Sequence, residues 1–159
     1  MTINEYNRCV DDFSDGVYRF LLKNIKDSAI AQDLVQDSFM KLWIKRKDVD
    51  NRKSKSYLFS TAYHTMIDYI RKNERITSIE GNEKYIPVST ENYSDLKEIL
   101  NHAVQQLPDV QRSVVLLRDY EGYSYKEIGE ILGISETNVA TKINRIKLKL
   151  KQRFENHKK

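Results

Sequence analysis

Apolar side chains recur every three or four positions along most of this 159-residue chain, and that spacing constrains the fold more than any other feature. Each such run predicts an amphipathic helix that turns one face toward a core. The runs cover residues 6–22, 30–43, 58–70, 96–107, 110–120, 125–132 and 139–154. Only 5 glycines and 2 prolines are present, which argues against a β-sandwich or barrel with many tight turns. The sequence therefore predicts an all-α protein.

The apolar period is lost over residues 73–94, which include Gly81, Pro87 and several serine, threonine and asparagine side chains. This composition is typical of a linker. We therefore expect two small helical domains joined by a flexible linker. The predicted boundaries place an N-terminal helical bundle at 1–73, the linker at 74–95 and a C-terminal domain at 96–159.

Residues that can begin or end helices stand at the edges of the apolar runs. The candidate N-caps are Asp27 or Ser28, Ser54 or Ser56, Ser124 and Ser135. We expect the helix over 58–70 to end near Arg71 and Lys72, and the polar stretch 45–55 before it to form a loop. Pro108-Asp109 suits a first helical turn, and Gly122 suits a helix end.

Charge alternates in blocks along the chain, although the net charge is only +4. Residues 41–75 hold 10 basic and 4 acidic side chains, and residues 140–159 hold 8 and 1. The blocks 1–40 and 76–139 are net acidic. Two basic blocks indicate two contacts with a polyanion, and the alternative is a set of solvated helix faces.

Residues 124–139 have the form of a helix-turn-helix. Ile128, Ile131 and Leu132 would point inward from the first helix, and Gly133 permits the left-handed backbone of a tight turn. The second helix would then expose short polar and basic side chains, which suit base edges and phosphates in a major groove. This face consists of Ala140, Thr141, Lys142, Asn144, Arg145 and Lys149. The alternative is an ordinary helical hairpin with a basic tail.

The helix over 58–70 and its flanks interleave aromatic and basic side chains. Aromatic faces stack on unpaired bases, at about 1–3 kcal/mol each, while cations hold the backbone. The set consists of Tyr57, Phe59, Tyr63, His64 and Tyr69 with Lys53, Lys55, Arg71, Lys72 and Arg75. A core position is the better interpretation for Phe59, and either position is open for Tyr63 and Tyr69. His64 has no partner at metal-ligand spacing, so no zinc site is predicted.

The helix over 30–43 offers a different kind of surface. Leu34, Phe39 and Leu42 can face inward while polar residues face outward. The outward set consists of Gln32, Asp33, Gln36, Asp37, Lys41 and Lys45. An aromatic side chain beside acidic groups suits a protein partner, although Trp43 can equally be a core residue.

Taken in order, these segments resemble the bacterial RNA polymerase sigma factors of the sigma-70 class, in the small ECF (extracytoplasmic function) group. Residues 31–43 look like the family's segment that binds the polymerase β′ clamp helices. Residues 57–72 look like its promoter-melting helix. Leu107-Pro108, Arg112 and residues 121–128, followed by the recognition helix, look like its C-terminal domain.

The resemblance implies a protein without catalysis or cofactor that binds core RNA polymerase at the β′ clamp helices and the β flap. Its N-terminal domain would capture unpaired bases of the minus-10 element of promoter DNA, and its C-terminal domain would read the minus-35 element as a duplex. An anti-sigma factor would be a further partner. The implied polymerase-binding residues are Asp33, Gln36, Asp37, Phe39, Lys41, Leu42 and Trp43. The implied minus-10 residues are Lys55, Tyr57, Tyr63, His64, Asp68, Tyr69, Arg71 and Lys72. The implied minus-35 residues are Ser124, Tyr125, Ala140, Thr141, Lys142, Asn144, Arg145 and Lys149.

Two departures from the family pattern bear on base contacts. Tyr63-His64 stands where the family usually has Arg-Asn. In the recognition helix, Asn144 has the amide geometry that pairs with an adenine edge, which suggests an A-containing upstream element.

Other classes of function fit less of the chain. A helix-turn-helix regulator that binds duplex DNA without polymerase leaves residues 33–43 and the aromatic-basic helix unexplained. An enzyme is poorly supported, because His64, His102 and His157 are scattered and no phosphate loop, nucleophile motif or metal cluster is found. A single Cys9, no signal-peptide pattern and no apolar run of about 20 residues lead us to expect a cytoplasmic protein.

Overall fold

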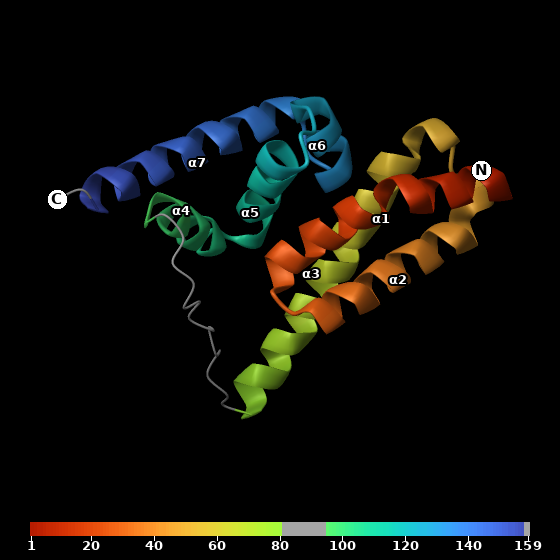
Figure 1. The fold of residues 1–159 in the computed structure, drawn as a ribbon, viewed down its shortest axis with the longest axis horizontal. Coiled ribbons are helices and arrows are strands. Elements are labelled where there is room, and N and C mark those ends of the chain that lie inside the picture. Colours follow the sequence, from red (N-terminus) through yellow and green to blue (C-terminus); the bar gives the residue numbers. More distant parts are fainter. Residues whose placement is uncertain (81–94, 158–159) are drawn as a thin grey trace.

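A computed structural model describes residues 1–80 and 95–157, and the regular elements in these ranges are all helical, which confirms the predicted class (Figure 1). The α-helices are α1 (Ile3–Ile25), α2 (Ser28–Lys45), α3 (Ser54–Glu80), α4 (Asp95–Gln105), α5 (Asp109–Val115), α6 (Tyr125–Leu132) and α7 (Glu136–His157). Two 3-10 turns, η1 (Arg46–Asp48) and η2 (Asn51–Lys53), join α2 to α3. A π-helical turn, η3 (Leu116–Tyr120), extends α5.

Side-chain caps begin several helices, and three of them were predicted. Thr2 and Ser124 each form a capping box with the glutamate three residues later. Asp27 accepts hydrogen bonds from two backbone amides in the first turn of α2. Ser135 accepts one from the first turn of α7. These caps satisfy backbone donors that the helices themselves leave free.

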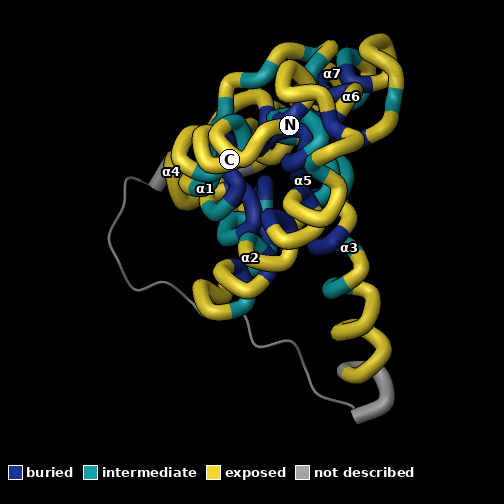
Figure 2. The backbone as a smooth tube through the Cα atoms, turned by 90° about the vertical axis from the view of Figure 1, so that its right-hand side faces the viewer, coloured by how far each residue is buried: buried dark blue, intermediate teal, exposed yellow. Residues whose placement is uncertain are grey.

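The predicted C-terminal end of the helix over residues 58–70 is wrong. Helix α3 continues to Glu80 instead of ending near Arg71 and Lys72, because no glycine or proline interrupts the chain before Gly81. Residues 71–76 are exposed, and this end of α3 projects alone from the molecule in Figure 2. The apolar period therefore stops where the core stops, not where the helix stops. The remainder of the predicted linker, residues 81–94, lies outside the described residues.

The stretch predicted as a loop contains η1 and η2, and Ser54 is the first residue of α3 rather than its cap. Its hydroxyl donates to the carbonyl of Asn51 at 2.7 Å. Short 3-10 turns of this kind are common where two helices are joined.

Helices α1, α2 and α3 pack into a bundle with a dense core (Figure 1). Its fully buried side chains include Val17, Phe20, Leu21, Ala31, Leu42, Leu58, Phe59, Ala62 and Met66. The rings of Phe20 and Phe59 meet edge to face, with centroids 6.0 Å apart. Cys9 is also buried, and burial raises the pKa of its thiol, so this cysteine acts as a packing residue.

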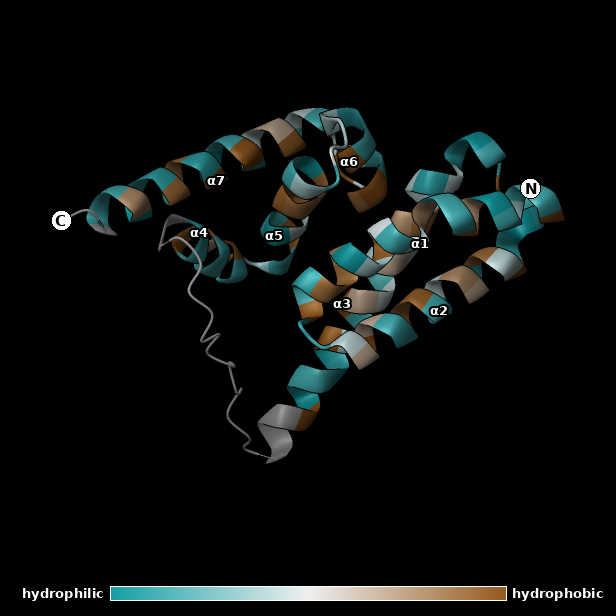
Figure 3. Cartoon of the chain, in the orientation of Figure 1, coloured by the Kyte–Doolittle hydropathy of each residue, from teal (hydrophilic) through white to brown (hydrophobic). Residues whose placement is uncertain are grey.

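The C-terminal region contains the predicted helix-turn-helix. Gly133 ends α6 with a left-handed backbone (φ 74°). A methyl group on Gly129 would lie 2.7 Å from the carbonyl oxygen of Ile134, so a side chain cannot fit where the turn crosses α6. Val139 and Ile143 bury the apolar side of α7, and Figure 3 shows hydrophobic and hydrophilic residues alternating along this helix.

The two helical regions touch each other directly. Buried apolar side chains of α3 and α6 belong to one continuous cluster. The ring of Phe59 on α3 packs edge to face on Tyr123, with centroids 5.1 Å apart. The sequence predicted two modules connected through a linker and gave no sign of this contact.

Candidate nucleic-acid and polymerase interfaces

The outer face of α7 presents the side chains predicted to read DNA. Val139, Ile143 and Ile146 are each no more than 6% exposed and hold the helix against the rest of the region. On the other side Thr141, Asn144, Arg145 and Lys149 are exposed, and Ala140 and Lys142 are half-buried. Short polar groups therefore lie beside cations on one accessible surface, as contact with base edges and phosphates requires.

The first turn of α6 adds a second group of candidates beside α7. The Tyr125 ring lines a hollow of about 240 Å³ between η3 and α7, and the Arg118 guanidinium lies 4.7 Å from its centroid. Arg118 also donates to the carbonyl of Tyr123 at 3.1 Å. Ser124 is exposed, and its hydroxyl already accepts the capping hydrogen bond of α6. These contacts make Tyr125 and Ser124 parts of the scaffold as well as surface residues.

A groove of about 370 Å³ between α2 and α3 gathers residues that the sequence had assigned to two different partners. Its lining consists of Lys41, Ile44, Lys45, Tyr57, Ser60, Thr61, His64, Thr65 and Asp68. Lys41 donates to the hydroxyl of Thr65 at 2.9 Å, so this lysine reaches across to α3. The groove combines an aromatic ring, hydroxyls and cations, which suits an unpaired nucleotide.

The other candidates on α3 lie in different surroundings. Arg71 and Lys72 are exposed, and Tyr69 is half-buried against the bundle. Lys55 forms an ion pair with Glu127 of α6, and its amino group lies 4.5 Å from the centroid of the Tyr123 ring. In this arrangement Lys55 is already engaged by the C-terminal region.

Tyr63 is a core residue, which corrects its prediction as a stacking side chain. It is 8% exposed, because it shares a face of α3 with Phe59 and Met66, about one turn away on either side. Burial raises the pKa of its hydroxyl. The neighbouring His64 is exposed, so it is the member of this pair that can meet a base.

The outer face of α2 presents acidic and apolar side chains together. Asp33, Gln36 and Asp37 are exposed. Met40, Trp43 and Ile44 are 60%, 36% and 67% exposed. A surface with exposed large apolar groups beside charges is typical of a protein-binding site.

Two predicted members of that surface are buried instead. Phe39 is 8% exposed and Leu42 is 0% exposed, so both side chains pack inside the bundle and hold α2 in place. Trp43 lies at the edge of the core: its ring is 4.9 Å from that of Tyr6, and the Arg46 guanidinium lies 3.7 Å from its centroid. The tryptophan is therefore a surface residue held in place on two sides.

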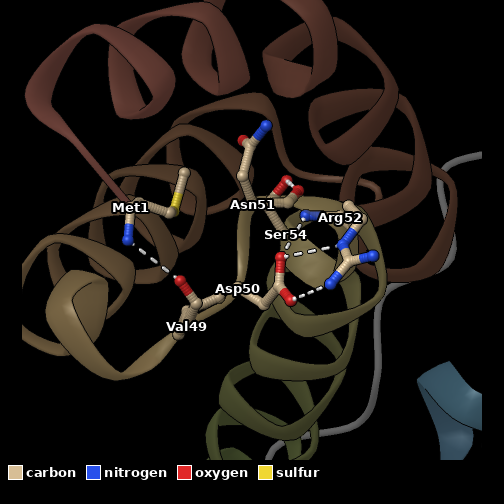
Figure 4. A network of polar contacts seen from close by, with 6 residues as sticks. All are labelled: Met1, Val49, Asp50, Asn51, Arg52 and Ser54. Atoms are coloured by element: carbon tan, nitrogen blue, oxygen red, sulfur yellow. Dashed lines mark hydrogen bonds and ion pairs between the residues drawn. The ribbon is translucent and has the colours of Figure 1, made fainter.

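Polar contacts hold the connection between α2 and α3 (Figure 4). The amino group of Met1 donates to the carbonyls of Arg46 at 2.6 Å and Val49 at 3.0 Å. Asp50 accepts from the backbone amide of Arg52 at 3.0 Å and pairs with its guanidinium at 3.1 Å. Hydrogen bonding from Arg52 lowers the pKa of Asp50. These contacts set the position at which α3 begins.

Within residues 1–80 and 95–157, no three histidine, cysteine, aspartate or glutamate side chains come together to form a candidate metal site. None of the helices in the described part of the chain is both long and apolar enough to cross a membrane.

Comparison with known proteins decides the family. The family described as "Sigma-70 region 2" matches residues 9–76, and the family described as "Sigma-70, region 4" matches residues 97–150. The ECF RNA polymerase sigma factor SigM of Bacillus subtilis is 34% identical over 156 residues, which cover 95% of this chain and 94% of SigM. This chain belongs to the ECF group of the sigma-70 family.

Further relatives agree with that assignment. The ECF sigma factor SigW of Bacillus subtilis is 28% identical over 86% of this chain and 81% of its own length. The fold matches RpoE, solved in complex with the anti-sigma factor NepR from Bartonella quintana, with a TM-score of 0.78, 21% identity and coverage of 96% and 98% of the two chains. It also matches CnrH, solved with the cytosolic domain of CnrY, with a TM-score of 0.71, 20% identity and coverage of 95% and 88%.

As an ECF sigma factor, the protein binds core RNA polymerase and directs promoter-specific initiation of transcription. Region 2 of the sigma factor contains the groove and the outer face of α2, and region 4 contains the helix-turn-helix. A helix-turn-helix regulator that works without polymerase is not favoured, because the region 2 match accounts for residues 9–76.

Three side chains on these surfaces of the sigma factor were not predicted as site residues from the sequence. Met40 and Ile44 stand four residues apart, away from the buried Leu42, so their helical spacing was the signal for a second apolar face. Arg118 stands in an acidic block of the sequence, and only the fold brings it against Tyr125.

Proposed function

We propose that this sigma factor holds promoter DNA at two places, through the groove of region 2 and the outer face of α7 in region 4. The observation that carries the proposal is the pairing of two chemically distinct surfaces on one chain. One is a groove with aromatic and basic lining, suited to unpaired bases, and the other is an exposed polar helix face, suited to a duplex.

The minus-35 element would be read by α7. Thr141, Asn144 and Arg145 are exposed and of the types that meet base edges, and Lys149 is suited to a phosphate. Asn144 would favour adenine, because its side-chain amide can donate and accept at the same base edge. Lys142, Ala140, Tyr125 and Ser124 would border this contact.

The minus-10 element would enter the groove between α2 and α3. Tyr57 and His64 would stack on or flank unpaired bases, and Arg71 and Lys72 would hold the backbone further along α3. Lys41 and Lys45 also line the groove and add positive charge where a phosphate would pass.

Core polymerase would dock on the outer face of α2. Asp33, Gln36, Asp37 and Trp43 support this assignment, and the exposed Met40 and Ile44 extend it. The polymerase β′ clamp helices would meet this face and the β flap would meet region 4. An anti-sigma factor would be a further partner. The protein would act in the cytoplasm without catalysing a reaction itself.

In vitro transcription tests the proposal. Purified chain and core polymerase are incubated with genomic promoter fragments, and transcripts should appear only when both are present. An Asn144→Ala/Arg145→Ala variant should lose initiation at promoters that depend on the upstream element while still co-purifying with core polymerase. Arg8→Ala, on an exposed part of α1, is the control and should behave as the wild type. Failure of the wild-type chain to be retained by core polymerase would refute the proposed function.

A further inference from the structure

A hollow of about 390 Å³ lies between the end of α1, one face of α4 and η3, and it shares no residue with the surfaces assigned to DNA or polymerase. This volume is in the usual range of small-molecule sites. Part of the lining is apolar, because Val104 and Leu116 are buried there beside the half-buried Leu22. The polar part consists of Lys23, Lys26, Lys97, Asn101, Gln105 and Tyr120. The hollow therefore combines apolar surface with side chains that can hold a charged ligand.

Positive charge gathers around this hollow. Lys23 and Lys26 come from the end of α1, and Lys97 comes from α4. None of the described residues that line the hollow is acidic. The nearby Glu121 acts on Lys23 through its charge, but both of its carboxylate oxygens accept hydrogen bonds from Arg19, at 3.1 and 3.0 Å. The described lining thus supplies cations from two helices and no carboxylate.

The helix ends explain only part of this charge. The carbonyl end of α1 favours cations, which suits Lys23 and Lys26. Lys97, however, stands in the first turn of α4, where the helix dipole disfavours a cation. Burial lowers the pKa of Lys23, and the charges of Arg19 and Lys97 lower it further against the opposing effect of Glu121. A bound anion would relieve the cost of holding these cations close together.

The backbone of Lys26 is a further sign that its side chain has a use. Lys26 ends α1 in a left-handed conformation (φ 62°), and within residues 1–80 and 95–157 it is the one residue other than glycine with a positive φ. Glycine is the usual residue at such a helix end, because a side chain costs free energy there. A lysine that lines the hollow from this position is consistent with selection for its charge.

Two contacts fix the polar groups of the hollow. The amino group of Lys23 lies 3.3 Å from the centroid of the Tyr120 ring, and the Tyr120 hydroxyl donates to the side-chain oxygen of Asn101 at 3.3 Å. Gln105 donates to the backbone carbonyl of Lys23 at 3.1 Å. Because the Asn101 oxygen is engaged, its NH2 group, which can only donate, is the part that can serve a ligand. The site therefore suits a ligand rich in acceptor oxygens.

We infer that this hollow binds a small phosphorylated compound, whose phosphate oxygens accept hydrogen bonds from Lys23, Lys26 and Lys97. Its organic part lies against Leu22 and Leu116. Phosphate oxygens are strong acceptors and lysine is a common partner for them. A lining drawn from three elements suits a compact ligand, whereas a polynucleotide follows an extended groove. The inference is independent of the proposed function, because none of these residues is assigned to DNA or polymerase.

Thermal unfolding and calorimetry with sodium pyrophosphate test the site. Pyrophosphate should raise the unfolding temperature of the wild-type chain above its value in sodium chloride of the same ionic strength, because it binds the folded chain. Lys23→Met should bind pyrophosphate about tenfold more weakly, the usual loss for one charge-assisted hydrogen bond. Lys126→Met, at an exposed position of α6, is the control and should bind as the wild type does. A wild-type chain that responds equally to both salts, or a Lys23→Met variant with unchanged affinity, would overturn the inference.

Lys26→Gly separates binding from folding. Glycine removes the charge and also relieves the left-handed backbone, so this variant should be at least as stable as the wild type in the absence of pyrophosphate. Its affinity for pyrophosphate should nevertheless fall about tenfold. A folded Lys26→Gly variant that binds pyrophosphate as tightly as the wild type would overturn the inference.

NMR spectroscopy locates the bound probe. Pyrophosphate should cause its largest shifts in the side-chain amide of Asn101 and the ring of Tyr120, and largest shifts on the exposed face of α7 would overturn the inference. A labelled single-stranded oligonucleotide should bind Lys23→Met as tightly as it binds the wild type. A parallel loss of oligonucleotide and pyrophosphate binding in that variant would assign the lysine to nucleic acid and overturn the small-molecule site.

Discussion

The guanidinium of Arg112 donates a hydrogen bond to the side-chain oxygen of Asn24, 2.8 Å away, and this buried contact joins region 4 of the sigma factor to region 2. The same guanidinium donates to the carbonyl of Leu107 at 3.2 Å and pairs with Asp109. Arg112 therefore links the beginning of α5, where two of its partners lie, to the end of α1. Its position explains how a charged residue is accommodated at 8% exposure.

Loss of this contact should destabilise the folded chain. Asn24→Ala leaves Arg112 without one acceptor and should lower the free energy of unfolding by about 1–3 kcal/mol. Arg112→Met removes all three contacts and should lower it by about 3 kcal/mol. Urea unfolding followed by circular dichroism measures both, with the exposed Lys126→Met as the control. An Asn24→Ala variant as stable as the wild type would show that the contact adds nothing.

The close crossing in the helix-turn-helix predicts a strong effect of one methyl group. Gly129→Ala would bring a carbon to 2.7 Å from the carbonyl oxygen of Ile134, so the turn must shift, at a cost of about 1–3 kcal/mol. We expect weaker binding of duplex DNA with little loss of core polymerase binding. Gly133→Ala is the matched comparison: it has nothing within 4 Å and is strained only by its φ of +74°. A Gly129→Ala variant that binds duplex DNA as tightly as the wild type would contradict the steric explanation.

Tyr63 and His64 should respond in opposite ways to truncation. Tyr63→Ala opens a cavity among buried residues and should lower the free energy of unfolding by about 3 kcal/mol, whereas Tyr63→Phe should retain most of the stability. His64→Ala changes an exposed side chain, so stability should hold while binding of single-stranded promoter DNA weakens. Thermal unfolding and oligonucleotide binding measure the two properties. A Tyr63→Ala variant that is as stable as the wild type but is defective in promoter melting would show that Tyr63 contacts DNA.

Lys142 and Arg145 should contribute to the salt dependence of duplex binding. If each neutralises a phosphate, then replacement by alanine should reduce the magnitude of the slope of log K against log salt by about 1. Binding of a minus-35 duplex at several salt concentrations measures this slope. Arg8→Ala serves as the control, since Arg8 lies on α1. An unchanged slope for either variant would assign that side chain to base contact or to no contact.

The ion pair of Lys55 and Glu127 predicts a pH dependence of the contact between α3 and α6. Because Lys55 lowers the pKa of Glu127, the ionised carboxylate stabilises the contact between α6 and α3. This stabilisation is fully present above the ordinary glutamate range and is lost as pH falls through the lowered pKa. NMR titration of the Glu127 carboxyl should give a higher pKa in Lys55→Met than in the wild type. The same pKa in both proteins would show that the pair does not persist in solution.

Much of the fold could be predicted because its signals are local. The caps at Asp27, Ser124 and Ser135 and the turn at Gly133 each depend on a few neighbouring residues, and all four agree with the structure. The end of α3 was missed because apolar spacing reports contact with a core, and this helix continues past its core.

The candidate surfaces could be predicted in outline only. The exposed residues of α7 could be predicted from helical spacing. The buried apolar residues lie on one side of the helix, so the residues between them must lie on the opposite, exposed side. Tyr63, Phe39 and Leu42 were placed on surfaces because their chemistry suits ligands and partners. Each is nevertheless buried, since packing depends on which helix lies opposite.

By itself, the sequence determined the helices, their caps, the helix-turn-helix and the resemblance to the sigma-70 family, because these depend on residues close together along the chain. Only the tertiary structure decided that Lys41 faces α3, that Arg112 reaches Asn24 and that Glu121 and Glu127 hold the two regions together. Those contacts join residues 24 to 102 positions apart, and no local pattern reports such a pairing.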